Sequence, residues 1–82
     1  MPPADHHVTL ITRRGCHLCE QAETLLRRLS REVGFPYTEI DVDADPARRA
    51  EYSDRVPVIL IDGREYGFWR VEEARFRVAV SR

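Results

Sequence analysis

The sequence predicts a small α/β protein in which one mixed sheet of four strands is flanked by helices. Three observations lead to this prediction. Apolar β-rich runs alternate with runs of helical spacing, one Asp-Gly hairpin signal lies in the second half, and 82 residues suffice for only one core. Residues 1–82 are therefore expected to form a single domain with the element order βαβαββα.

The first half of the chain predicts a strand, a helix and a second strand. Val8–Thr12 is rich in β-branched and apolar residues, as buried strands are. Apolar residues then recur every three or four positions over residues 18–33, which marks one face of a helix that Gly34 can end. The alternation over residues 37–42 predicts the next strand. Because a helix joins the two strands, they should be parallel.

The second half begins with a short helix and a hairpin. Asp45 is a favourable N-cap and Pro46 a favourable first residue for a helix that ends near Tyr52. Asp62-Gly63 is the strongest hairpin signal in the chain. It joins two expected antiparallel strands, Val58–Ile61 and Arg64–Phe68.

Residues 71–80 predict the last helix, but its buried face is ambiguous. Val71, Ala74 and Val78 line one side, whereas Phe76 and Val80 lie nearly opposite. Either this helix is buried on two sides, or the second pair forms a contact surface.

Composition excludes several functional classes. Thirteen basic and 14 acidic residues are interleaved and give a net charge of −1, so no basic footprint for nucleic acid is expected. No apolar run approaches the roughly 20 residues that span a bilayer. The N-terminal residues lack the pattern of a secretory signal. We therefore expect a cytoplasmic monomer without a membrane or nucleic-acid partner.

The two cysteines of the chain form the motif Cys16-His17-Leu18-Cys19, at the junction between the first strand and the first helix. Unpaired N–H groups and the helix dipole favour negative charge at a helix N-terminus, and the thiolate is the reactive form of cysteine. Cys16 is therefore the predicted nucleophile. A structural staple is a poor alternative, because a disulfide that closes so short a loop stabilises little.

Each residue of the motif has an expected role. Cys16 would attack a substrate disulfide, and Cys19, more buried and of higher pKa, would attack the resulting mixed disulfide and release the product. A protonated His17 would stabilise the Cys16 thiolate and make the oxidised form a stronger oxidant. An exposed, neutral His17 would have little effect, and both possibilities remain open.

The motif, a Val56-Pro57 pair before the third strand and the Asp-Gly hairpin together resemble the thioredoxin-like superfamily, and more closely its small glutaredoxin-like proteins. The resemblance implies a thioredoxin-like fold and dithiol–disulfide oxidoreductase activity without a resident cofactor. It also implies a cis bond between Val56 and Pro57, beside the cysteines, with the Val56 backbone available to an extended substrate. Arg13 takes the place of a lysine that supports the thiolate in glutaredoxins.

Two departures from the glutaredoxin pattern concern the substrate. His17-Leu18 replaces the usual Pro-Tyr, and aromatic Phe68 and Trp69 fall where glutaredoxins have a Gly-Gly loop and an acid that hold glutathione. These aromatic residues are either core or a rim for a protein or apolar thiol. The expected partners are a disulfide-containing protein or a small-molecule thiol. Glutathione is a possible co-substrate, and glutathione or a thioredoxin-type reductase a possible electron donor.

Two alternative functions keep the same cysteines. One is a non-catalytic thioredoxin-fold domain that senses redox state or binds a partner. The other is a metal site in which the CxxC, with His17 or with His6 and His7, holds zinc or shares an iron–sulfur cluster. A closed zinc site needs four ligands at suitable spacing, which this chain does not offer, so no metal ligand is predicted. His6 and His7 are expected to lie in a disordered terminus.

Overall fold

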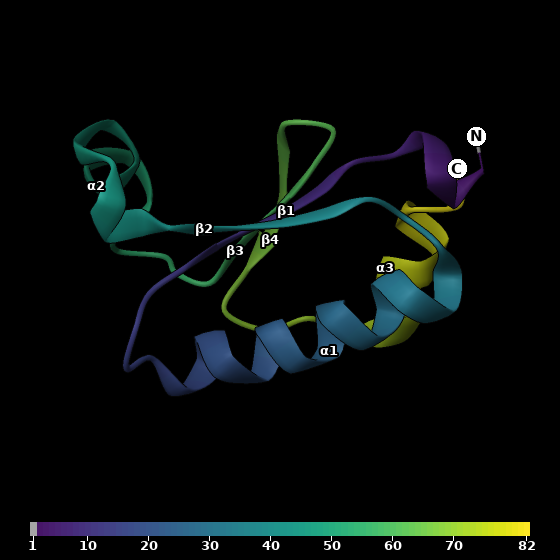
Figure 1. Cartoon of the computed structure of the whole chain (residues 1–82), viewed down its shortest axis with the longest axis horizontal. Helices are drawn as coiled ribbons and strands as arrows, with labels where there is room; N and C mark the ends of the chain where they lie inside the picture. The colour runs from purple at the N-terminus through teal and green to yellow at the C-terminus, as the bar shows by residue number, and fades with distance from the viewer. Residues whose placement is uncertain (1) are drawn as a thin grey trace.

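Four strands form one mixed sheet in the order β2-β1-β3-β4 (Figure 1). The computed structural model describes residues 2–82. The central strand β1 runs parallel to β2 and antiparallel to β3, which pairs with β4 in a hairpin. The α/β class and the four-stranded mixed sheet are thus confirmed. The strands are β1 (Val8–Thr12), β2 (Tyr37–Asp41), β3 (Val58–Ile61) and β4 (Arg64–Phe68).

Helices lie on both sides of this sheet. The long helix α1 and the last helix α3 lie on one side, and α2 lies at the far end on the other side (Figure 1). As predicted, α2 begins at Pro46, with the Asp45 carboxylate accepting the Ala47 N–H at 3.0 Å. The helices are α1 (His17–Val33), α2 (Pro46–Tyr52) and α3 (Glu73–Ala79), and short 3-10 turns are η1 (Pro3–Asp5) and η2 (Val42–Ala44).

The second strand is shorter than predicted. It ends at Asp41, because the Asp41 carboxylate accepts the N–H of Asp43 at 2.9 Å and turns the chain into η2. The buried Val42 therefore belongs to this turn and not to the strand.

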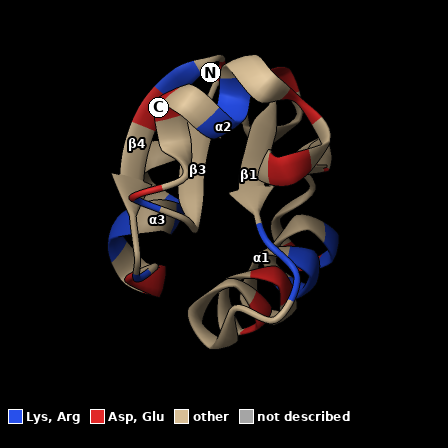
Figure 2. Ribbon diagram, turned by 90° about the vertical axis from the view of Figure 1, so that its left-hand side faces the viewer, with Lys and Arg blue, Asp and Glu red and all other residues tan. Residues whose placement is uncertain are grey.

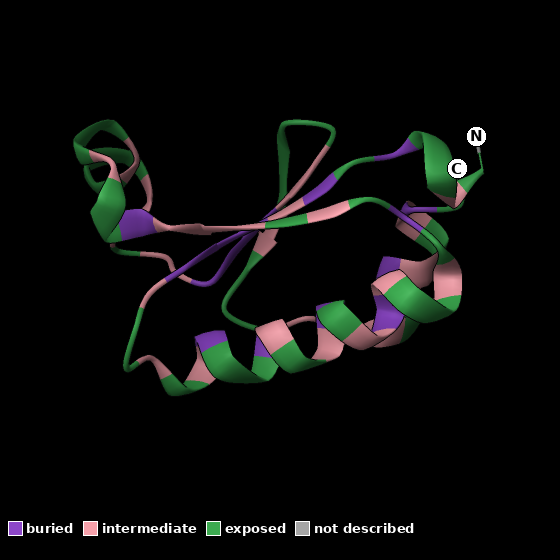
Figure 3. Cartoon of the chain, viewed as in Figure 1, coloured by how far each residue is buried: buried purple, intermediate pink, exposed green. Residues whose placement is uncertain are grey.

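The sheet separates two apolar clusters. Figure 3 shows buried positions along the sheet and on the side of α1 that faces it. The larger cluster fills the space between the sheet and the pair α1 and α3, and the smaller one lies on the opposite side. Because side chains alternate along a strand, Leu10 faces the larger cluster and Ile11 the smaller one. Each face of β1 is therefore buried, as its continuous apolar sequence predicts.

Helix α3 buries the face that the sequence left in doubt. Phe76 and Val80 have no exposed surface, whereas Val78 is 55% exposed. Phe76 packs edge-to-face against Phe35 and Tyr66, with ring centroids 5.6 Å away in both pairs. The helix has only seven residues, Glu73–Ala79, so Val71 lies before it. Both expected alternatives are therefore wrong: Phe76 and Val80 lie in the core and not on a contact surface, and Ala74 and Val78 on the other side of the helix are exposed.

Residues 2–7, before β1, have a defined structure, which corrects the expectation for His6 and His7. His6 is buried, its Nδ1 lies 2.6 Å from Asp62 Oδ2 and its Nε2 lies 2.7 Å from the main-chain oxygen of Arg82. His7 donates its N–H to Asp62 at 2.8 Å. Both neighbours of the His6 ring are acceptors, so only the imidazolium satisfies both with N–H donors. The pKa of His6 is accordingly raised above 6.5, mainly by the hydrogen bond to Asp62.

This contact predicts a pH-dependent stability. A group with a raised folded-state pKa contributes its stability below its unfolded pKa and loses it as the pH rises through the folded value. A His6→Gln variant should therefore have a lower urea midpoint than the wild type at pH 6, and a smaller difference at pH 9. Asp62 stays charged at both pH values, because the His7 N–H and the His6 ring lower its pKa. Equal differences at the two pH values would contradict the prediction.

Acidic and basic residues lie side by side on the surface (Figure 2). Arg27, for example, holds Glu39 with two hydrogen bonds of 2.7 and 2.6 Å. Over residues 2–82, no helix has the length and apolar character needed to cross a membrane.

Candidate active site

Cys16 occupies the N-cap of α1. Its backbone is extended, at φ −101° and ψ 113°, and its Sγ accepts the N–H of Cys19 at 3.2 Å. Gly15, directly before it, has a φ of +73°, a conformation that a side chain disfavours, so glycine permits the turn from β1 into the helix. Cys16 is thus partly exposed and stands at the positive end of the helix dipole, an environment that favours negative charge.

Cys19, one turn further along α1, is in a different environment. It has no exposed surface, and neither cysteine is in a disulfide. Burial, together with the hydrogen bond to Cys16, raises the pKa of Cys19 to about 11, although the Thr12 hydroxyl and the Arg13 backbone oppose this increase. The two thiols therefore differ in access, as a nucleophile and a resolving cysteine should.

The peptide bond between Val56 and Pro57 is cis, as the resemblance implied. Pairing of Ile11 with Val58 places the start of β3 beside the end of β1, so Pro57 and the cysteine loop lie at the same end of the sheet. The carbonyl of Pro57 accepts the N–H of Trp69 at 2.8 Å, which links the segment after β4 to the segment that contains the cis proline. A substrate contact at Val56 and Pro57 stays a prediction.

Arg13 and His17 stand near the cysteines in the sequence, but their side chains form hydrogen bonds with other residues. Arg13 holds the Asp43 carboxylate with bonds of 2.9 and 3.0 Å. That hydrogen bond is the main cause of its raised pKa, to which negative charge on the two sulfurs adds. His17 is exposed at the start of α1, where the Gln21 amide donates to its Nε2 at 3.1 Å. Tuning of the thiolate by these two residues stays a prediction.

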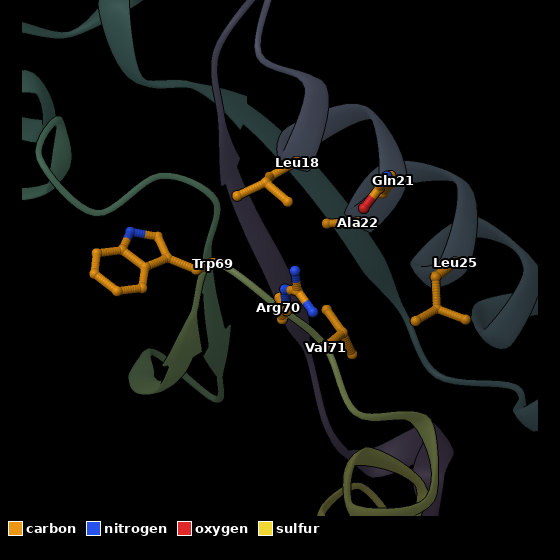
Figure 4. Close-up of a pocket in the computed structure, with 7 residues that line it drawn as sticks. All are labelled: Leu18, Gln21, Ala22, Leu25, Trp69, Arg70 and Val71. Atoms are coloured by element: carbon orange, nitrogen blue, oxygen red, sulfur yellow. The ribbon is translucent and has the colours of Figure 1, made fainter.

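A groove of about 430 Å³ begins at the motif and follows α1 (Figure 4). Leu18, between the two cysteines, projects with Ala22 and Leu25 from α1 toward the segment of Trp69, Arg70 and Val71. The groove thus combines aliphatic walls with one arginine and the Gln21 amide.

Phe68 and Trp69 are surface residues and not core. They are 41% and 53% exposed, and their rings pack edge-to-face with centroids 4.9 Å apart. Trp69 has a φ of +69°, a conformation uncommon outside glycine. Trp69 lines the groove at its edge with its ring turned away from α1 (Figure 4), and Phe68 lies outside the groove, so two exposed aromatic residues stand where the resemblance leads one to expect a glycine loop.

The structure adds two residues that the sequence did not single out. The Thr12 hydroxyl donates to the Glu23 carboxylate at 2.9 Å, and the Thr12 side chain lowers the pKa of Cys19. Thr12 follows the buried Leu10 by two residues and therefore lies on the same face of the sheet. This alternation was the signal in the sequence that could have placed Thr12 on the side of α1. Among residues 2–82, no group of three or more His, Cys, Asp or Glu side chains is arranged to hold a metal ion.

A mixed sheet of this order, with a CxxC at the start of its first long helix, defines the class of thioredoxins and glutaredoxins. The family model described as "Glutaredoxin-like domain (DUF836)" matches residues 7–81, and the chain belongs to this family. The chain is 45% identical over 80 positions to the uncharacterized protein Rv0508 of Mycobacterium tuberculosis, covering 92% of this chain and 82% of that protein.

Solved structures show the same fold. Protein Ne2328 of Nitrosomonas europaea aligns with a TM-score of 0.77 and 27% identity, over 93% of this chain and 92% of that one. Glutaredoxin 1 of Francisella tularensis aligns with a TM-score of 0.58 and 25% identity, over 92% of this chain and 96% of that one. Thioredoxins are among the other structures that align along the chain.

Proposed function

We propose that the protein is a dithiol–disulfide oxidoreductase with Cys16 as nucleophile and Cys19 as resolving cysteine. The observation that supports this most strongly is the asymmetry of the pair. Cys16 is partly exposed at a helix N-terminus, and Cys19 is fully buried one turn further along. This arrangement provides one attacking thiolate and holds the second thiol ready for the intramolecular step.

The reaction would proceed in two exchanges. The Cys16 thiolate attacks one sulfur of a substrate disulfide, the substrate S–S bond breaks, and one substrate thiolate leaves and takes a proton from water. Cys19 then loses its proton and attacks Cys16 Sγ, which releases the second substrate thiolate. The substrate gains two electrons and the protein becomes the Cys16–Cys19 disulfide. An external thiol must then reduce that disulfide.

The groove supports a proposal about partners. Aliphatic walls with the exposed Trp69 at the edge suit a protein disulfide or an apolar thiol. Glutathione is the less favoured co-substrate, because Phe68 and Trp69 replace the glycine loop that holds it in glutaredoxins. Glutathione or a thioredoxin-type reductase remains the proposed electron donor, and the cytoplasm the proposed compartment, with the protein acting as a monomer.

Turnover with two substrates tests the proposal. The purified protein should accelerate the reduction of insulin disulfides by dithiothreitol, and to a lesser extent the reduction of a mixed disulfide of glutathione. The dithiol should have a reduction potential of about −200 to −270 mV, the range of glutaredoxins and thioredoxin. A protein that forms the Cys16–Cys19 disulfide but accelerates neither reaction would instead be a redox-sensing domain.

A further inference from the structure

The loop that carries Cys16 (residues 13–16, the cysteine loop) faces the segment before β3 across the end of the sheet. Val56 in that segment is only partly buried, and no backbone hydrogen bond joins it to another of residues 2–82, which leaves its N–H and C=O for a substrate. The strand pairing ends at Ile11 and Val58. Other contacts must therefore hold the two segments at a fixed spacing beyond the sheet.

Arg13 makes such a contact. It lies three residues before Cys16 and holds the Asp43 carboxylate in a fork, with Nε and Nη2 donating at 2.9 and 3.0 Å. Its Nη1 donates at 3.4 Å to the main-chain oxygen of Ser53, the residue that ends α2 and stands three positions before Val56. One guanidinium therefore joins the cysteine loop to η2 and to the start of the Val56 segment.

Asp43 is itself fixed from α2. Arg49 donates to the main-chain oxygen of Asp43 at 2.8 Å, and its Nε lies 3.3 Å from Asp43 Oδ1. The side chains of Arg13 and Asp43 are 33% and 42% exposed, so solvent screens much of their attraction. The contribution of the pair is therefore geometric, because a planar fork fixes both distance and direction, which a single ammonium group does not.

We propose that Arg13 is a positioning residue that holds the cysteine loop at the spacing from the Val56 segment which an extended protein disulfide requires. This inference rests on the proposed function and concerns its substrate class. A protein disulfide must bring a sulfur to Cys16 while its backbone lies along Val56, whereas a small disulfide needs access to Cys16 alone. Loss of the fork should therefore impair exchange with protein disulfides and spare small ones. In direct support of the thiolate, by contrast, the charge of Arg13 would matter and its fork would not.

Two reactions of the same variants test this role. One is the reduction of insulin disulfides by dithiothreitol with the protein as catalyst. The other is the first release of thionitrobenzoate from dithiobis-nitrobenzoate, a small disulfide that Cys16 attacks. Arg13→Lys keeps the charge without the fork, and Asp43→Asn keeps the shape without the charge. Each should lower kcat/KM for insulin about tenfold, because small displacements of reacting groups are costly. The rate of the first thionitrobenzoate release and its pH profile should match those of the wild type.

Further variants separate this role from the alternatives. The double variant should be no slower with insulin than either single variant, because the two residues act as one unit. Arg48→Lys alters another ion pair of α2, 2.9 Å from Asp45, and should leave both reactions unchanged.

Three results would contradict the proposal in different ways. Undiminished insulin reduction by Asp43→Asn would show that the freed charge of Arg13 supports the thiolate directly. Equal slowing of both reactions would show a general disturbance of the site. A wild type that releases thionitrobenzoate but does not accelerate insulin reduction would overturn the proposed function, and this inference with it.

Discussion

Replacement of Cys16 by serine should reduce disulfide exchange to the rate measured without protein, whereas replacement of Cys19 by serine should stop the reaction halfway. The reason is the unequal exposure of the two sulfurs. The N-capping Cys16 is the thiol that a substrate can reach, and Cys19 is buried behind it. With dithiobis-nitrobenzoate, Cys19→Ser should therefore release one thionitrobenzoate per chain and retain the other as a stable adduct visible by mass spectrometry.

The wild type provides the comparison for both variants. It should release two thionitrobenzoates and end without an adduct, as the Cys16–Cys19 disulfide. Rapid release from Cys16→Ser would show that the buried thiol is the attacking group, and the assignment of roles would have to be reversed.

The largest expected effect on stability comes from Phe76→Ala. Phe76 has no exposed surface and joins α3 to Phe35 and Tyr66 through two edge-to-face contacts. Truncation of a buried phenylalanine costs about 3–5 kcal/mol of unfolding free energy. A domain of this size has a total of only about 5–15 kcal/mol, so the variant should be close to unfolding at room temperature. Thermal denaturation followed by circular dichroism should show a decrease in Tm of at least about 12 °C.

Val78→Ala is the matched control, because it shortens an apolar side chain two residues away on the same helix. Val78 is 55% exposed, so the change should alter the unfolding free energy by less than about 0.5 kcal/mol. Similar losses in both variants would mean that α3 presents a different face to the sheet.

Local sequence patterns were sufficient to predict the strands and the first helix. Continuous apolar runs in β1 and β3 and the three-and-four spacing in α1 each report the burial of neighbouring residues, which a local pattern can encode. The positions of the cysteines at the start of α1 and of the cis Pro57 were also marked locally in the sequence, whereas the roles assigned to these residues stay predictions.

Features that depend on distant partners could not be predicted in this way. Helix α3 has seven residues, so two possible faces fit its sequence, and only the packing of Phe76 against Phe35 and Tyr66 decides between them. His6 was placed in a disordered terminus because its partner Asp62 lies 56 residues away. Thr12 looked like an ordinary strand residue, because its contact with Glu23 requires the strand and helix to be docked.

The hydrogen bond between His6 and the main chain at Arg82 has a practical consequence. It brings the two ends of the described chain together, at the opposite end of the long axis from the start of α1 (Figure 1). An affinity tag, a fluorescent fusion partner or a tether to an electrode can therefore be attached at either end and still leave Cys16 facing the solution. Electrochemistry on an immobilised layer is thus a direct way to measure the dithiol potential.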